Sequence, residues 1–131
     1  MKKILIVIAD YYEDISLSLL KSAQYKLNNF SLKVIKVPGV FEIPVTISKN
    51  IKKYDAFIAL GCVIKGETPH FKFISQSVFD GIKDLNLRAT CPIVLCLLTD
   101  DNYQQSIERS GGKHGNKGYD CAAAAAKMSL I

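Results

Sequence analysis

The sequence contains no tryptophan, two histidines, two arginines and no Cys-x-x-Cys pair. Its four cysteines are Cys62, Cys91, Cys96 and Cys121. They follow no metal-ligand spacing with the histidines, and three of the four lie in or beside apolar or alanine-rich segments. A free cysteine in such a segment behaves as a small hydrophobic side chain. These absences predict structural thiols and argue against a disulfide framework or a metal site.

The chain also lacks any run near the roughly 20 apolar residues that cross a membrane. Its start, two lysines and a short apolar run, superficially resembles a secretory signal. However, Asp10, Glu13 and Asp14 follow directly, and no small-residue cleavage site is present. We therefore expect a first β-strand, a cytoplasmic protein and no membrane partner. No repeat, linker or charge block divides the sequence, which predicts one domain over residues 1–131.

Nucleic-acid signals are missing as well. The formal net charge is +5, but the lysines are scattered, and no basic run with interleaved aromatic residues occurs. Neither a GxxxxGK[ST] phosphate loop nor a GxGxxG fingerprint is present. We therefore expect the positive charges to lie on a solvated surface, which is compatible with a small phosphorylated substrate. We expect no nucleic-acid partner and no nucleotide cofactor.

What is present is an alternation of strand and helix patterns. Apolar or β-branched runs predict four strands, over residues 3–9, 32–37, 55–63 and 92–98. Three- and four-residue apolar spacing and helix-start signals predict helices over about 14–29, 44–52, 71–85, 102–110 and the alanine-rich end of the chain. This order predicts an α/β fold, a three-layer α-β-α sandwich with a four-stranded parallel sheet, flavodoxin-like.

Three details of that fold are specific enough to be tested. The strand over 32–37 should lie nearer an edge, whereas 92–98 should be fully buried. Thr99, Asp100 and Asp101 should provide the N-cap of the following helix. Residues 111–118 should form a glycine-rich loop before the last helix.

In parallel α/β sheets, ligands bind beyond the carboxyl ends of the strands. The loops expected there hold the unusual residues of the chain; they are 10–14, 38–43, 62–70, 95–100 and 109–117. His70 follows a strand end and a tight turn, and imidazole suits proton transfer near neutral pH, although a lone histidine is more often structural. The Gly66-Glu67-Thr68 turn opens onto a helix N-terminus that favours an anion; a plain capping turn with Thr68 as N-cap is the alternative.

Further candidates lie on the other loops. Arg109 can bind a phosphate bidentately, and a helix-surface salt bridge, for instance with Glu108, is the alternative. Glu42 can accept hydrogen bonds from the N–H or O–H donors of a ligand while Phe41 or Tyr11 packs on a flat heterocycle; for Glu42 the alternative is a favourable acid in a first helical turn.

With these residues in place, the chain resembles the lumazine synthase family over nearly its whole length. Four motifs carry the resemblance in the same order and spacing: Pro38-Gly-Val-Phe-Glu-Ile-Pro44, Gly61-Cys-Val-Ile-Lys-Gly-Glu-Thr-Pro-His-Phe71, Leu98-Thr99 followed by Asn102, and Ile107-Glu-Arg-Ser-Gly111 leading to Asn116-Lys-Gly118. The resemblance implies condensation of 5-amino-6-(D-ribitylamino)uracil with 3,4-dihydroxy-2-butanone 4-phosphate. The products are 6,7-dimethyl-8-ribityllumazine, phosphate and water, and no metal or organic cofactor takes part.

The resemblance also implies roles for individual residues. His70 would be the proton donor and acceptor. The phosphate site would contain Glu67, Thr68, Arg109 and Lys117. The ribitylaminouracil would contact Tyr11, Val40, Phe41, Glu42, Cys62, Val63, Ile64 and Leu95. The chain departs from the family at three places. Asp10-Tyr11 stands where relatives usually have Arg-Phe or Arg-Trp, and Cys62 stands where they usually have Thr. Leu95-Cys96 stands where they usually have Phe-Gly or Asn-Gly.

Assembly is implied in the same way. In the family, the active site lies between neighbouring subunits of a pentamer, and some members form a 60-subunit icosahedral shell. The segment Gly111-Gly-Lys-His-Gly115 is similar to a tight turn of shell-forming members. Riboflavin synthase is a candidate partner. Two other functions fit the fold. One is that of a non-catalytic relative that binds lumazine or flavin or forms a shell. The other is that of a flavodoxin-like electron carrier, but the sequence has no phosphate loop after the first strand to support it.

Overall fold

The computed structural model describes residues 1–88 and 91–131. Its parallel strands are β1 (Lys3–Ala9), β2 (Ser31–Val37), β3 (Ala56–Ile64) and β4 (Ile93–Asp100). The helices are α1 (Glu13–Lys26), α2 (Ile43–Lys49), α3 (His70–Arg88), α4 (Tyr103–Arg109) and α5 (Lys117–Met128), with a 3-10 turn η1 (Val40–Glu42) before α2. A short antiparallel hairpin joins β5 (Ser110–Gly112) and β6 (Gly115–Asn116).

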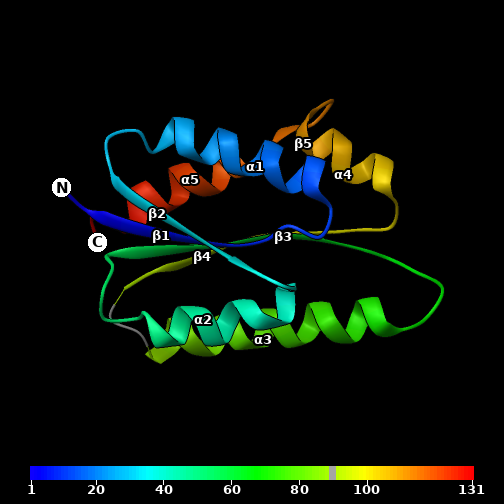
Figure 1. The fold of residues 1–131 in the computed structure, drawn as a ribbon, viewed down its shortest axis with the longest axis horizontal. Coiled ribbons are helices and arrows are strands. Elements are labelled where there is room, and N and C mark those ends of the chain that lie inside the picture. The colour runs from blue at the N-terminus through cyan, green and yellow to red at the C-terminus, as the bar shows by residue number, and fades with distance from the viewer. Residues whose placement is uncertain (89–90) are drawn as a thin grey trace.

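The four parallel strands form one sheet in the order β2-β1-β3-β4. Helices α1, α4 and α5 lie on one side of it, and α2 and α3 lie on the other (Figure 1). The three-layer, flavodoxin-like α/β fold is thus confirmed. Both termini lie at the end of the sheet where β1 begins, so the opposite end, where the strands finish, is left to the loops (Figure 1).

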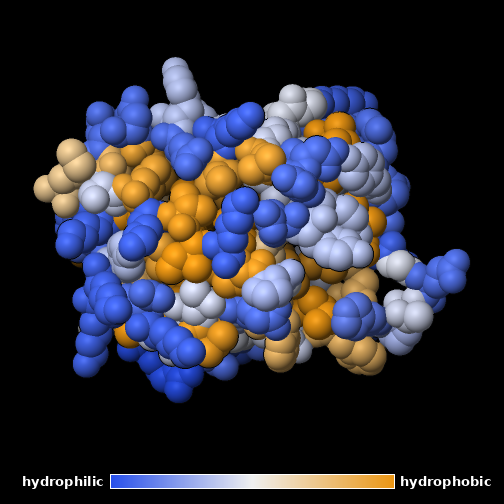
Figure 2. Space-filling model, in the orientation of Figure 1, coloured by the Kyte–Doolittle hydropathy of each residue, from blue (hydrophilic) through white to orange (hydrophobic). Residues whose placement is uncertain are grey.

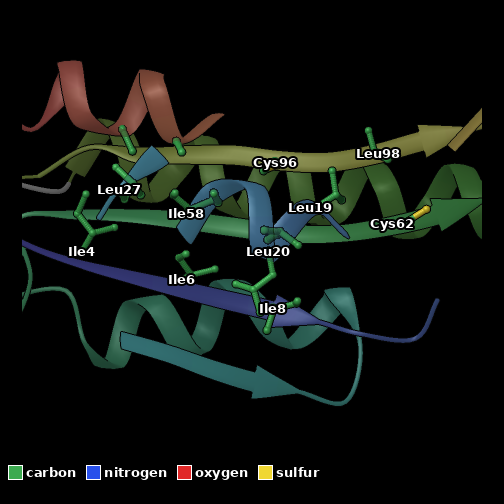
Figure 3. Close-up of a cluster of buried hydrophobic side chains, with 14 of the residues drawn as sticks. Ile4, Ile6, Ile8, Leu19, Leu20, Leu27, Ile58, Cys62, Cys96 and Leu98 are labelled. Carbon is green, nitrogen blue, oxygen red and sulfur yellow. The ribbon is translucent and has the colours of Figure 1, made fainter. Parts of the chain in front are cut away.

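Alternation along the strands builds a core on each side of the sheet. Ile4, Ile6 and Ile8 of β1 pack in the same cluster as Leu19 and Leu20 of α1 (Figure 3). The intervening residues of β1 belong to a second cluster with Ile43, Ile47 and Val78 from α2 and α3. Because successive side chains of a strand point to opposite faces, a strand buried on both faces has to be apolar throughout. This is why the run over residues 3–9 is so uniform.

The two edges of the sheet differ from expectation in one respect. β2 lies at an edge, as predicted, and its Leu32 and Val34 are half-buried. Figure 2 shows apolar side chains gathered across the middle of the face that carries this edge. β4 forms the other edge, and Leu95 and Leu97 are only half-buried. The prediction of a fully buried strand over 92–98 was therefore wrong, because β4 has a neighbouring strand on one side only.

The start of α4 also differs from the prediction. Thr99 and Asp100 belong to β4 and pair with Val63 and Ile64 of β3, so their backbone is extended. The N-cap is Asn102, whose side-chain oxygen accepts a hydrogen bond of 2.9 Å from the Gln105 N–H. The pairing of β4 with β3 continues further than the apolar run, and this moves the helix start downstream.

The glycine-rich segment is more ordered than the predicted loop. Residues 110–116 form the β5–β6 hairpin, in which Gly111 and Gly115 adopt positive φ angles of 116° and 81°. Asn116 then caps α5 by accepting from the Gly118 N–H at 2.8 Å. α1 and α2 are shorter than predicted, ending at Lys26 and Lys49, whereas Pro44 occupies the first turn of α2 as expected.

Candidate active site

A pocket of about 370 Å³ opens at the carboxyl ends of β1 and β3. It is lined by Tyr11, Tyr12, Gly39, Val40, Cys62, Val63, Ile64, His70 and Ile74. Six of the residues expected from sequence meet there, from segments that lie far apart along the chain: Tyr11, Val40, Cys62, Val63, Ile64 and His70. The walls are largely apolar and aromatic, which suits a flat heterocycle better than a highly charged ligand.

His70 is the first residue of α3, and its side chain is exposed at the pocket. Its backbone N–H lies 3.4 Å from the Thr68 Oγ1, a long hydrogen bond of the capping kind. Within residues 1–88 and 91–131 the imidazole forms no hydrogen bond or ion pair. The backbone is therefore held by the start of the helix, while both ring nitrogens are available for proton exchange with a ligand.

The segment before His70 is the turn for which the sequence predicts anion binding. Glu67 and Thr68 lie in the exposed connection between β3 and α3, which projects beyond the sheet at the right of Figure 1. The Lys65 N–H donates to the Asp100 carbonyl oxygen at 2.9 Å, so the connection starts from a fixed point on β4. It ends at the N-terminus of the 19-residue helix α3, where the helix dipole favours an anion.

Tyrosines form one wall of the pocket. The rings of Tyr11 and Tyr12 meet edge-to-face with centroids 5.0 Å apart, and Tyr12 lies 6.5 Å from Tyr103 of α4. The Tyr103 hydroxyl donates to the Asp14 carboxylate and so ties α4 to the first turn of α1. This hydrogen bond lowers the pKa of Asp14 and raises that of Tyr103, whereas burial raises the pKa of Tyr12.

Sequence reasoning missed three lining residues: Tyr12, Gly39 and Ile74. Tyr12 belongs to the predicted 10–14 loop and occupies the N-cap position of α1, but its side chain makes no capping hydrogen bond and lines the pocket. Ile74 could have been found from spacing, because it follows His70 by four residues and so shares its face of α3. Gly39 belongs to the Pro38-Gly-Val-Phe-Glu-Ile-Pro44 motif, but its residue type does not predict a place in the pocket wall.

Two expected residues lie in a different hollow. Phe41 and Glu42 line a depression of about 380 Å³ between η1, α2 and α3, together with Pro44, Val45, Ser77 and Gly81. Phe41 is 59% exposed there. Within one chain, these two residues therefore do not share the pocket of His70, although Val40 next to them does.

The remaining candidates lie around β4, α4 and α5. Leu95 packs at the edge of the core on the α2–α3 side, and Lys117 is the exposed first residue of α5. The Arg109 Nη1 lies 3.6 Å from the Asp100 Oδ1 and donates to the Gln105 carbonyl oxygen at 3.1 Å. An ion pair of Arg109 thus exists, but with Asp100 of β4 instead of the neighbouring Glu108.

Cys62 is the buried end of a polar chain. Its thiol lies 3.3 Å from the Ser106 Oγ, and the Ser106 hydroxyl donates to the Asp100 Oδ2 at 2.8 Å. Burial raises the pKa of the Cys62 thiol, and the negative charge of Asp100 raises it further, against the lowering effect of Ser106. The thiol is therefore held protonated near neutral pH, which makes it a wall of the pocket and a poor nucleophile.

The family model for 6,7-dimethyl-8-ribityllumazine synthase matches residues 1–131. The chain belongs to this family. Among curated relatives with that name, those of Flavobacterium johnsoniae, Clostridium kluyveri and Christiangramia forsetii are 53%, 47% and 41% identical over 97, 104 and 134 residues. These matches cover 72%, 77% and 96% of this chain.

The same matches cover 51%, 67% and 80% of the relatives. The chain therefore spans about half the length of the Flavobacterium johnsoniae relative that it matches. In the part of the chain that the structure describes, no helix is long and apolar enough to span a membrane. No three histidine, cysteine or acidic side chains gather there in an arrangement that could hold a metal ion.

Proposed function

We propose that this protein condenses 5-amino-6-(D-ribitylamino)uracil with 3,4-dihydroxy-2-butanone 4-phosphate to 6,7-dimethyl-8-ribityllumazine, phosphate and water, a step of riboflavin biosynthesis. The observation that carries this proposal is the position of His70, exposed at the mouth of an apolar and aromatic pocket in a chain that matches the lumazine synthase family throughout. A flat ring and a proton-transfer group can meet there.

The chemistry asks little of the protein beyond positioning and proton transfer. An amine of the pyrimidine attacks the ketone, and loss of water gives an imine. Phosphate then leaves, and attack of the second amine closes the ring with loss of another water. Each step moves a proton to or from nitrogen, carbon or oxygen, which is the role proposed for His70. Holding the two reactants in contact supplies a large part of the rate.

The substrates divide between two environments. Tyr11, Val40, Cys62, Val63 and Ile64 form the apolar pocket proposed for the pyrimidine. The phosphate is assigned to Arg109, Lys117 and the backbone of Glu67 and Thr68. Guanidinium and helix N-terminal N–H groups are the donors that bind phosphate well.

The separation of the candidates within one chain supports an active site between subunits. Phe41, Glu42 and Leu95 lie outside the pocket of His70, as do Arg109 and Lys117. We propose that a neighbouring copy brings the missing groups to each pocket, in a pentamer or in a 60-subunit shell built from pentamers. In the same proposal the protein is cytoplasmic, and riboflavin synthase is a candidate partner.

Turnover tests the function directly. Purified protein mixed with both substrates should produce the absorbance and fluorescence of the lumazine and release phosphate, and light scattering on the same sample should give at least the mass of a pentamer. Binding of the lumazine without turnover at high enzyme concentration would favour a non-catalytic relative. A protein that neither binds the lumazine nor turns over the substrates would refute both the enzyme and the non-catalytic relative.

The role of His70 is tested by substitution. His70→Ala should lower kcat by about 10²–10⁴-fold, the usual contribution of a general acid–base group, with an unchanged particle mass. His114→Ala is the matched control, because the other histidine is exposed in the β5–β6 hairpin, and it should turn over like the wild type. Equal kinetics for the two variants would remove the catalytic role of His70.

A further inference from the structure

Within one chain, Asp100 contacts both segments that are assigned to phosphate. It is the last residue of β4 and is 9% exposed. Its carbonyl oxygen accepts from the Lys65 N–H at 2.9 Å, at the start of the connection that contains Glu67 and Thr68. Its carboxylate lies 3.6 Å from the Arg109 Nη1. One residue thus fixes the origin of the anion-binding turn and contacts the guanidinium.

The carboxylate oxygens of Asp100 have separate partners. Oδ2 accepts from the Ser106 hydroxyl, which in turn lies 3.3 Å from the Cys62 thiol in the pocket wall. Oδ1 faces Arg109. A carboxylate this buried is costly unless it is hydrogen-bonded and paired with a positive charge, and both conditions are met. The arrangement is therefore a closed polar network and not a chance surface ion pair.

The same contacts orient the guanidinium. The Arg109 Nη1 is used inward, toward Asp100 and the Gln105 carbonyl oxygen at 3.1 Å. Within the described residues, Nε and Nη2 make no hydrogen bond. These two groups form the parallel pair of N–H donors that binds two oxygens of a phosphate. The Arg109 side chain is 36% exposed, so this edge can reach a ligand.

We propose that Asp100 is the positioning residue of the phosphate site: it holds Arg109 by the Nη1 edge so that Nε and Nη2 stay directed at the phosphorylated substrate. The proposal rests on the proposed function through the assignment of Arg109 to phosphate. It adds a residue that does not touch the substrate and whose negative charge would, by itself, repel it.

The charge of Asp100 and its positioning role predict opposite effects of the same substitution on phosphate binding. If Asp100 only neutralised local charge, then Asp100→Asn would remove a repulsion and tighten phosphate binding. If Asp100 positions Arg109, the same change weakens binding, because the guanidinium loses its anchor and regains rotamer freedom. The substitution keeps the shape of the side chain and an oxygen that can accept from Ser106.

The measurement is the dissociation constant of inorganic phosphate by titration calorimetry on the assembled protein, with the KM for each substrate alongside. Asp100→Asn should raise the phosphate dissociation constant about tenfold, the usual loss for a contact with a charged group. The KM for the phosphorylated ketone should rise with it, while the KM for the pyrimidine and the particle mass stay unchanged.

Two variants serve as references. Arg109→Ala should abolish the phosphate signal, and adding Asp100→Asn to it should have no further effect. Asp10→Asn is the matched charge control: Asp10 follows β1 on the same rim and pairs with Lys36 at 3.4 Å, away from Arg109. This control should leave the phosphate dissociation constant within about twofold, because the Asp10 carboxylate pairs with Lys36 and not with Arg109.

The outcomes separate the two hypotheses. Suppose that Arg109→Ala loses phosphate binding while Asp100→Asn binds phosphate as tightly as the wild type or more tightly. This result overturns the positioning role of Asp100 and leaves the proposed function standing. Unchanged binding in Arg109→Ala overturns the phosphate assignment and, with it, this proposal. If Asp100→Asn does not assemble, Arg109→Lys replaces it in the test. The lysine ammonium should stay on the Asp100 carboxylate, so this variant should bind phosphate as poorly as Arg109→Ala does. Phosphate binding as tight as in the wild type would refute the proposal.

Discussion

At the scale of single residues, two thiols meet where β4 passes α5. The Cys96 thiol lies 3.6 Å from the Lys117 carbonyl oxygen, and the Cys121 thiol lies 3.7 Å from the Leu95 carbonyl oxygen. A hydrogen bond between the two thiols raises the pKa of Cys96, which is also buried, and lowers that of Cys121. The positive charge of Lys117 acts in the same downward direction on Cys121.

This asymmetry predicts an order of alkylation. At pH 7.5 or so, iodoacetamide should modify Cys121 before Cys62 and Cys96, because the thiolate is the reactive form and Cys121 is the thiol whose pKa is lowered. Peptide mass spectrometry over time measures the order. Cys96→Ala should slow the reaction of Cys121 by removing its hydrogen bond, and equal rates for all thiols in the native protein would contradict the prediction.

At the scale of elements, α5 depends on one glycine. A Cβ atom at Gly118 would lie 2.1 Å from the Leu19 carbonyl oxygen of α1 and 2.9 Å from the Asn116 Oδ1. The first of these is a backbone atom, which cannot move without shifting α1. The close approach of the two helices therefore requires glycine in the Asn116-Lys-Gly118 motif, for packing and not for a left-handed conformation.

Gly118→Ala should accordingly destabilise the protein by about 1–3 kcal/mol, the usual cost of forcing an extra carbon into a packed contact. Thermal unfolding by circular dichroism measures the loss. Gly66→Ala is the matched control, because a Cβ there meets no atom within 4 Å and its φ is not positive. A melting temperature for Gly118→Ala equal to that of Gly66→Ala would contradict the packing argument.

At the scale of the whole molecule, apolar side chains are left exposed on the α2–α3 side. Phe41, Val45 and Phe73 are 59%, 52% and 63% exposed, and the first two line the hollow beside Gly81. Apolar surface of this kind is typical of subunit contacts. It agrees with the proposal that a second copy completes each active site.

Val45→Glu should therefore lower the particle mass, because a carboxylate placed in an apolar contact between copies would lose its hydration. Light scattering at several concentrations measures the change. Tyr25→Glu is the control on the opposite side, on α1, where the side chain is 75% exposed, and it should leave the mass unchanged. Wild-type mass for Val45→Glu would exclude this face as a subunit contact.

Most of the fold was predictable, because each pattern reports a local property. The unbroken apolar run over 3–9 indicated a strand covered on both faces, and the three- and four-residue spacing after Phe71 indicated α3. The same reasoning failed for β4. A run of apolar residues does not distinguish burial inside one chain from burial by another, so Leu95 and Leu97 looked like core residues but lie at an edge.

The sequence by itself determined the fold class, the family and the residue types that the loops carry, because residue types and their spacing are local. Only the tertiary structure decided which loops share a pocket. It brought Tyr12 and Ile74 to His70 and directed Phe41 and Glu42 into another hollow. It also paired Arg109 with Asp100. Such pairings depend on strand order and helix packing, which join residues far apart in the chain and leave no local pattern to read.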